Sequence, residues 1–138
     1  MRDMDVVNIY YGAYYEWMER SLGAFFARVG HPVSEIFGGG LAFPTVQSGC
    51  TYRAPVVLDE VLTVRSWVSM VGRTSFTVRH QFSRGGQGQL VAEGFATYVW
   101  VKRPEMTPIP VPDWCRTLAA APRSSEATVP PTTTRISE

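Results

Sequence analysis

The sequence contains little of what marks a metal site, a disulfide framework or a nucleic-acid-binding surface. Its two cysteines, Cys50 and Cys115, form no C-x-x-C motif and no Cys/His cluster, so neither a disulfide framework nor a zinc site is predicted. Thirteen Lys and Arg residues against twelve Asp and Glu residues give a net charge of +1. Such a balance creates no field that favours nucleic acid or an anionic membrane as a partner.

Long apolar runs are also absent, because no run approaches the roughly 18 residues of a membrane-spanning helix. Asp3 and Asp5 stand where a signal peptide requires basic residues, so no leader is predicted. Hydrophobic residues nevertheless make up 45% of the 138 residues, which is enough for the core of about one domain. We therefore expect a soluble, cytoplasmic protein without a metal or another cofactor.

Proline is scarce in residues 1–103, which hold three of the ten prolines. The segment 104–112 (PEMTPIPVP) contains four, which excludes a helix or a central strand and predicts an extended surface segment. Beyond Trp114, Ser, Thr and Pro dominate, so too little apolar surface remains to offset the entropy cost of ordering. The sequence therefore predicts one folded domain over residues 1–115 and a disordered tail over 116–138.

Residues 13–29 predict one long helix. Its apolar residues recur at spacings of three and four and are Tyr14, Trp17, Met18, Leu22, Phe25, Phe26 and Val29. Gly30 and Pro32 then end the helix. Aromatic and methionine side chains at this spacing are typical of a core-facing stripe, so we expect the helix to be largely enclosed.

After the glycine run at 38–40 the apolar period changes from that of a helix to that of a strand. Val, Thr, Phe, Tyr and Trp are frequent in four predicted strands, residues 46–53, 60–70, 75–83 and 89–102. The turns at 72–73 and 85–88 are so short that the strands they join must form antiparallel hairpins. One helix and one sheet each have a single apolar face. The sequence therefore predicts an α+β domain in which the helix packs across an antiparallel sheet of four to five strands.

Three segments together resemble a known family. The first carries Asp3, Asp5, Tyr10, Tyr11, Tyr14, Trp17 and Glu19, and is similar to the D-x-D…Y-Y-x-x-Y-x-x-W-x-E opening of the 4-hydroxybenzoyl-CoA thioesterase family. Residues 43–64 (FPTVQSGCTYRAPVVLDEVLTV) resemble its second strand and the acidic pair that opens the next one. Residues 72–84 (GRTSFTVRHQFSR) resemble its basic turn and the strand that follows. The resemblance implies a hotdog fold and hydrolysis of an acyl-CoA, or acyl-carrier-protein, thioester to a free acid and a thiol.

The resemblance assigns the catalytic carboxylate to Asp5, the second acidic residue of the D-x-D segment. A thioester carbonyl is activated and its thiolate leaves readily, so one carboxylate suffices, either as a nucleophile or as a general base that activates water. The sequence does not separate these roles. The alternative is that Asp3 and Asp5 form a solvated pair, one of which helps to cap the helix that follows.

A helix start is the second expected catalytic element. Backbone N–H groups at a helix N-terminus are unpaired and carry partial positive charge, so they can bind a developing oxyanion. The family directs such a donor at the thioester oxygen, and the matching backbone here belongs to Tyr11 or Gly12. Alternatively, Gly12 has no role in catalysis and is present because a turn there needs the backbone freedom of glycine.

Three further residues are candidates for substrate binding, and the resemblance assigns two of them, Glu19 and Arg73. Glu19 is expected to face the acyl pocket, unless it is a surface carboxylate that pairs with Arg20 or Arg28. Arg73 matches a basic turn that contacts the nucleotide phosphates of coenzyme A, and an arginine suits that ligand. Ser75 is expected to hydrogen-bond the acyl group or water, unless it is merely a polar residue at the end of a strand.

Two other reactive side chains are interpreted as structural. His80 shares a strand face with Phe76, Val78 and Phe82, so we expect a buried, hydrogen-bonded or interface histidine rather than a catalytic base. Cys50 alternates with its neighbours on a predicted strand and has no base nearby in the sequence. We expect it to be a small buried hydrophobe rather than a nucleophile.

Family members place their active site between subunits, which implies a homodimer or a homotetramer. The predicted strand 46–53 would leave an exposed apolar edge in a monomer, which favours the same interpretation. The alternative function is a non-catalytic acyl-thioester-binding or scaffold protein of the same fold. Two departures favour it: the segment from Asp5 to Tyr14 is one residue shorter than in many members, and no strand precedes the D-x-D segment. A hotdog dehydratase is less consistent, since its His-based hydration motif is not visible.

Overall fold

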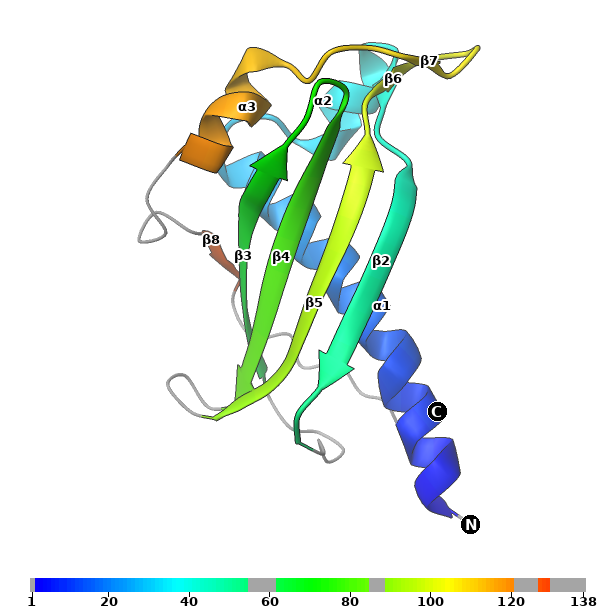
Figure 1. Ribbon diagram of the computed structural model, residues 1–138, viewed down its shortest axis with the longest axis vertical. Helices are drawn as coiled ribbons and strands as arrows, with labels where there is room; N and C mark the ends of the chain where they lie inside the picture. The colour runs from blue at the N-terminus through cyan, green and yellow to red at the C-terminus, as the bar shows by residue number, and fades with distance from the viewer. Residues whose placement is uncertain (1, 55–61, 85–88, 121–126, 130–138) are drawn as a thin grey trace.

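The computed structural model describes residues 2–54, 62–84, 89–120 and 127–129, with the side chains of the first helix described from Tyr14 onward (Figure 1). Its elements are α1 (Arg2–Arg28), α2 (Val33–Gly38), β1 (Leu41–Ala42), β2 (Thr45–Tyr52), β3 (Leu62–Val71), β4 (Ser75–Arg84), β5 (Leu90–Val99), β6 (Val101–Lys102), β7 (Thr107–Pro108), α3 (Asp113–Ala120) and β8 (Ala127–Val129). None of the helices in the described ranges is long and apolar enough to cross a membrane.

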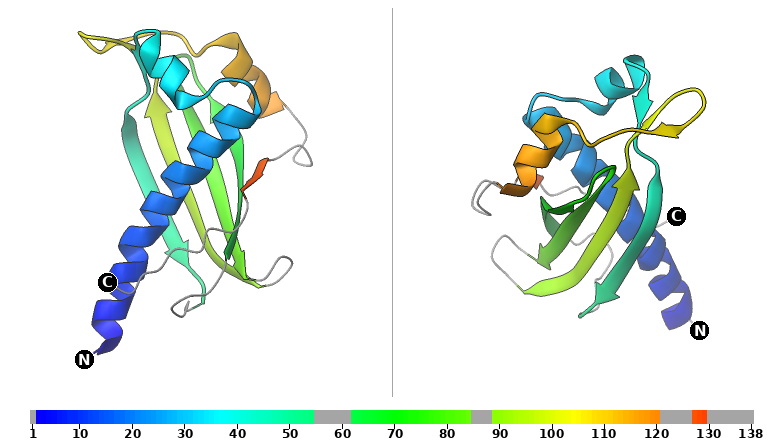
Figure 2. Two further views of the ribbon diagram at one scale, coloured as in Figure 1. Left: turned by 180° about the vertical axis from the view of Figure 1, so that it is seen from behind. Right: turned by 45° about the horizontal axis from the view of Figure 1, so that its top comes forward.

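A five-stranded antiparallel sheet in the order β2-β5-β4-β3-β8 forms one layer, and α1 crosses one face of it as the other layer (Figure 2). The predicted α+β arrangement is therefore confirmed. The strand predicted over 89–102 is divided in two at Trp100. β6 leaves the large sheet there and joins β1 and β7 in a small second sheet.

The core lies between α1 and the inner face of the sheet. The predicted apolar stripe is buried from Tyr14 to Phe26, whereas Val29 at its end is exposed. Strand β4 shows the alternation that this arrangement requires, because Phe76, Val78, His80 and Phe82 face α1 and are buried. The alternating residues, which include Ser75 and Thr77, lie on the opposite face, which is turned toward the viewer in Figure 1.

Helix α1 begins earlier than the sequence indicated. The prediction began the helix at residue 13, but the helix runs without a break from Arg2 to Arg28. The eleven added positions contain Asp3, Asp5 and Gly12. Aspartate and glycine are poor helix formers, and the apolar spacing that predicted the helix begins only at Tyr14.

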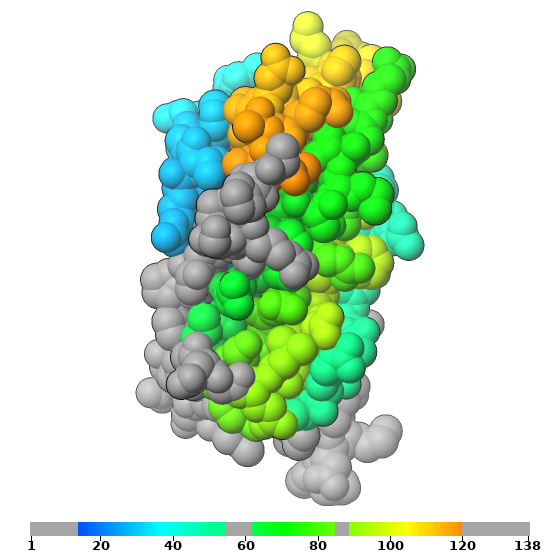
Figure 3. Space-filling model, turned by 60° about the vertical axis from the view of Figure 1, so that its left-hand side comes forward, coloured from blue at the N-terminus to red at the C-terminus, as the bar shows by residue number. Residues whose placement is uncertain are grey.

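The tail predicted to be disordered over 116–138 is partly ordered, so that prediction is wrong for residues 116–120 at the end of α3 and for β8. Within the predicted tail, Leu118 and Ala119 on α3 are partly buried and pack against the core, and Arg116 Nη2 donates to the Gly72 carbonyl at 3.2 Å. The space-filling view shows α3 between α1 and the β3–β4 hairpin (Figure 3). Strand β8 pairs with the edge of β3, with Thr128 opposite Arg65. The rest of the predicted tail, 121–126 and 130–138, lies outside the described residues.

Deleting residues 117–138 is therefore expected to destabilise the fold. The deletion removes β8 and the end of α3, where Leu118 packs against the core. Lost burial and strand pairing together should lower the free energy of unfolding by about 2 kcal/mol, which corresponds to a fall in Tm of roughly 5 °C. Urea and thermal denaturation of the full and truncated chains measure this loss. Leu118→Ala removes part of the same buried surface, so it should lower the stability by a smaller amount. An unchanged Tm would restore the disordered-tail interpretation.

Candidate active site

Two adjoining pockets lie beside α1 at the β2–β5 edge of the sheet. The larger has a volume of about 440 Å³ and the smaller about 330 Å³, and Glu19, Thr45 and Tyr98 line both. Aromatic walls in the larger pocket come from Phe37, Phe43 and Tyr98. A volume of this size lies within the range of roughly 300–1,000 Å³ found for small-molecule sites. Because they share these residues, the two pockets form one continuous groove that extends in both directions from Glu19.

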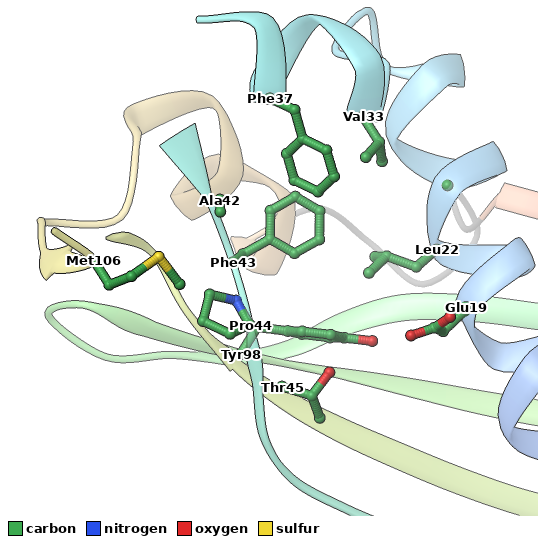
Figure 4. Close-up of a pocket in the computed structure, with 11 residues that line it drawn as sticks. Glu19, Leu22, Val33, Phe37, Ala42, Phe43, Pro44, Thr45, Tyr98 and Met106 are labelled. Carbon is green, nitrogen blue, oxygen red and sulfur yellow. The ribbon is translucent and has the colours of Figure 1, made fainter. Parts of the chain in front are cut away.

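Three elements bring these shared residues together. Thr45 begins β2 and lies opposite Tyr98 in the β2–β5 register, and α1 carries Glu19 across this edge. Figure 4 shows the Glu19 carboxylate and the Tyr98 hydroxyl pointing toward one another, with Thr45 beside them. Burial, and then the negative charge of Glu19, hold the pKa of Tyr98 above its usual range. Tyr98 is therefore a neutral phenol, which can donate a hydrogen bond to an oxygen in the groove.

Glu19 lines the acyl-sized groove rather than pairing with Arg20. The Arg20 side chain instead contacts Glu16, with Nη2 and Oε2 3.2 Å apart, one helical turn earlier. Glu19 is itself exposed, so the groove is open to solvent at the carboxylate. Glu19 thus lines both pockets, and its role in substrate binding remains a prediction.

The structure does not bring Asp5 and Glu19 together within one chain. Both lie on the continuous helix α1, fourteen positions apart. At 1.5 Å per residue their Cα atoms are about 21 Å apart along the helix axis. Asp5 and Glu19 of one protomer therefore do not belong to one compact catalytic site.

Tyr11 and Gly12 do not form a helix start. They lie nine and ten positions after Arg2, inside α1. In the interior of an α-helix each backbone N–H is bonded to the carbonyl four residues earlier. The prediction that these two residues present unpaired amides at a helix N-terminus is therefore wrong.

Arg73 and Ser75 lie at the β3–β4 turn, away from the groove. The Arg73 carbonyl accepts a hydrogen bond from the Val111 N–H at 2.9 Å, and the Gly72 carbonyl accepts one from Arg116 Nη2 at 3.2 Å. These bonds tie the turn to the segment around α3, while the Arg73 residue is exposed. Ser75 lies on the sheet face opposite α1, so in one chain it does not meet Glu19.

A buried polar network crosses the core beneath α1. The hydroxyls of Ser21 on α1 and Ser66 on β3 are hydrogen-bonded to each other, and Ser66 Oγ lies 2.7 Å from His80 Nδ1. Burial lowers the pKa of His80 to about 3, so the imidazole is neutral near pH 7. His80 is thus buried and hydrogen-bonded, as predicted.

Cys50 on β2 is half-buried rather than fully buried. Burial raises the pKa of its thiol to about 11, so the reactive thiolate is scarce at neutral pH. This agrees with the prediction that Cys50 is no nucleophile. Among the described residues, no cluster of three or more His, Cys, Asp or Glu side chains is arranged to hold a metal ion.

Sequence reasoning missed Thr45, Tyr98 and Met106 as groove residues. Thr45 and Tyr98 lie within or next to predicted strands, and alternation could have placed Tyr98 on the inner face. Nothing in the sequence showed that these positions meet Glu19, because the meeting depends on where α1 crosses the sheet.

The fold and the groove define a class of protein. One long helix across a five-stranded antiparallel sheet is the arrangement of the hotdog fold, and an apolar groove beside a carboxylate suits an acyl group. The profile of the thioesterase superfamily matches residues 8–91, more than half of the chain. This chain therefore belongs to the thioesterase superfamily, which confirms the family resemblance seen in the sequence.

Solved structures confirm the hotdog fold. A gentisyl-coenzyme A thioesterase is 28% identical, with a TM-score of 0.71 and coverage of 80% of this chain and 85% of that one. A hypothetical protein from Thermus thermophilus is 29% identical, with a TM-score of 0.69 and coverage of 79% and 82%. A 1,4-dihydroxy-2-naphthoyl-CoA thioesterase from Synechocystis, 18% identical with a TM-score of 0.71 and coverage of 79% and 80%, supports the fold alone. Functionally curated sequences give no match.

Proposed function

We propose that this thioesterase hydrolyses an acyl-CoA to a free acid and CoA, and that Asp5 is the catalytic carboxylate. The observation that carries the proposal is the groove at Glu19, an acyl-sized apolar space in a chain of the thioesterase superfamily. The similarity to a gentisyl-coenzyme A thioesterase supports coenzyme A rather than a carrier protein as the thiol. Release of free CoA thiol from a panel of acyl-CoA substrates tests it.

Asp5 can act in either of two ways. As a nucleophile, its carboxylate oxygen bonds to the thioester carbon and expels the CoA thiolate, and water then hydrolyses the mixed anhydride to the acid and free Asp5. As a general base, Asp5 takes a proton from a water molecule whose oxygen attacks the same carbon, and the proton then passes to the departing thiolate. In both mechanisms the acyl group lies along the apolar groove, and the CoA portion extends toward solvent.

The proposed site is shared between two protomers, because one chain holds Asp5 and Glu19 about 21 Å apart along α1. Among the described strands, β2 is at the edge of the sheet and pairs only with β5. It contains neither a charged residue nor a proline to discourage further pairing, and Val46 on it is 59% exposed. A second copy paired along β2 would place another α1 near the groove. The assembly is then a homodimer, or a homotetramer of such pairs.

The protein is therefore expected to be an oligomer in solution. Multi-angle light scattering at micromolar concentration should give at least twice the 15.4 kDa of one chain. Val46→Lys should weaken the association because it places a charge on the edge that pairs, and turnover should fall with it. Met70→Lys is the matched control, because Met70 is 66% exposed on β3, away from the β2 edge. A monomeric wild-type protein with full turnover would contradict a shared site.

Arg73→Ala is expected to raise KM for acyl-CoA and leave kcat nearly unchanged. The proposed contact of Arg73 is with the nucleotide phosphates, far from the reacting carbon, so its loss removes mainly uniform binding. Added salt should mimic the substitution, because the contact joins opposite charges at the surface. Acyl-pantetheine substrates, which lack the nucleotide, are the control. Equal losses with these substrates would exclude the phosphate contact.

A non-catalytic acyl-thioester-binding protein is the second candidate function. The observation that favours it is that α1 continues through Tyr11 and Gly12, which leaves no helix start there to polarise a carbonyl. Such a protein would bind acyl-CoA in the same groove without releasing CoA. Measured turnover separates the two functions.

A further inference from the structure

The larger pocket has a polar end and an apolar end. Glu19 and Thr45 lie at one end, and Figure 4 shows Met106 at the other, across the ring of Phe43 and the proline Pro44. Phe37 of α2 lines the pocket above them and is itself 41% exposed. An acyl group that enters past Glu19 therefore reaches Met106 last.

Met106 is held in an unusual backbone conformation at this end. Its φ is +62°, and among the described residues it is the only one other than glycine with a positive φ. A side chain disfavours this region, so the conformation persists only where the surrounding structure holds it. It falls in the turn between β6 and β7, which pair through Lys102 and Thr107.

The same turn is fastened to α2 and the segment after it. The Arg103 N–H donates to the Gly40 carbonyl at 2.8 Å, and Arg103 Nη2 donates to the Phe37 carbonyl at 2.9 Å. The Arg103 guanidinium also lies 6.0 Å from the centre of the Phe37 ring. The position of Met106 is thus fixed relative to the pocket wall, although the residue is 46% exposed.

We propose that Met106 is the end wall of the acyl pocket and sets the longest acyl group that the enzyme accepts, an inference that rests on the proposed hydrolysis of acyl-CoA. Methionine is unbranched and flexible, so it fills an irregular space without being part of a packed core. A smaller residue opens the pocket end to solvent, where a longer apolar chain can continue. A larger residue shortens the pocket while leaving the polar end at Glu19 unchanged.

The test compares Met106→Ala and Met106→Trp with the wild type on saturated acyl-CoAs from butanoyl to tetradecanoyl. Met106→Ala should move the optimum of kcat/KM to longer chains, with a change on the order of tenfold in the ratio of long to short substrates. Met106→Trp should move the same ratio in the opposite direction. Met106→Gly removes the backbone strain as well and should match the alanine variant in chain preference. Met70→Ala, at an exposed methionine outside the pocket, should leave the profile unchanged.

An active enzyme whose chain-length profile is the same in all the Met106 variants would overturn the inference and leave the proposed function standing. If no acyl-CoA is hydrolysed, the proposed function fails, and calorimetric affinities for the same acyl-CoAs then decide the inference. Affinity that shifts toward longer chains in Met106→Ala supports Met106 as the end wall. Affinity that does not depend on acyl chain length, or a dependence that is the same in the wild type and the Met106 variants, contradicts Met106 as the end wall.

Discussion

Replacing Asp5 by Asn is expected to lower kcat by about 10²–10⁴-fold while acyl-CoA still binds. The amide matches the carboxylate in size, but it neither attacks a carbonyl nor takes a proton from water. The loss corresponds to roughly 3–5 kcal/mol of transition-state stabilisation, the usual effect of removing such a group. Steady-state kinetics and binding measurements on the purified variant test this.

Asp3→Asn is the matched control for this prediction. Both residues lie near the start of α1, and each substitution removes one negative charge that interacts favourably with a helix N-terminus. The two variants should therefore lose similar, small amounts of stability, and only Asp5→Asn should lose most of its turnover. Equal and small kinetic losses would favour the binding-protein function. A large loss for Asp3→Asn alone would assign the chemistry to the other carboxylate.

Acidification from pH 7 to pH 4 is expected to destabilise the fold by a few kcal/mol through His80. Burial lowers the pKa of His80 from 6.5 to about 3 in the folded protein, whereas the unfolded chain keeps the ordinary value. Between these values the unfolded chain binds one more proton, so the stability is fully present above pH 6.5 and falls as the pH decreases toward 3. Protonation would also place a charge next to Ser66 in the buried network.

His80→Gln separates this effect from the titration of other groups. Glutamine retains a polar side chain that can hydrogen-bond Ser66, but it does not titrate. Urea unfolding at intervals between pH 7 and pH 4 should show a markedly smaller loss of stability in the variant than in the wild type. Parallel curves for the two proteins would show that His80 is not the source of acid sensitivity.

The part of the fold that follows from local pattern was predictable from the sequence. The spacing of Tyr14, Trp17 and Leu22 defined the buried face of α1, and the alternation from Phe76 to Phe82 defined the inner face of β4. Short turns made the hairpins antiparallel. These features depend on residues close in sequence, so the sequence alone contains the information that specifies them.

The errors and omissions arise where distant segments decide the structure. The composition beyond Trp114 indicated disorder, yet Leu118 and Ala119 pack against a core cluster that includes Phe26 and Trp100, whose proximity no local pattern reveals. Tyr98 and Met106 become groove residues only because α1 and α2 pack where they do. The helix start assigned to Tyr11 and Gly12 came from family resemblance, and α1 extends past both.

Release of free CoA thiol is the measurement that tests the proposed function most directly. The wild-type protein, at catalytic concentration, is mixed with aromatic and medium-chain acyl-CoAs, and thiol is followed with a chromogenic disulfide. We predict multiple turnovers with at least one acyl-CoA, and loss of that turnover in Asp5→Asn. Thiol release no faster than spontaneous hydrolysis for every acyl-CoA, in a protein that still binds these ligands, would contradict the proposed enzyme and leave an acyl-thioester-binding protein.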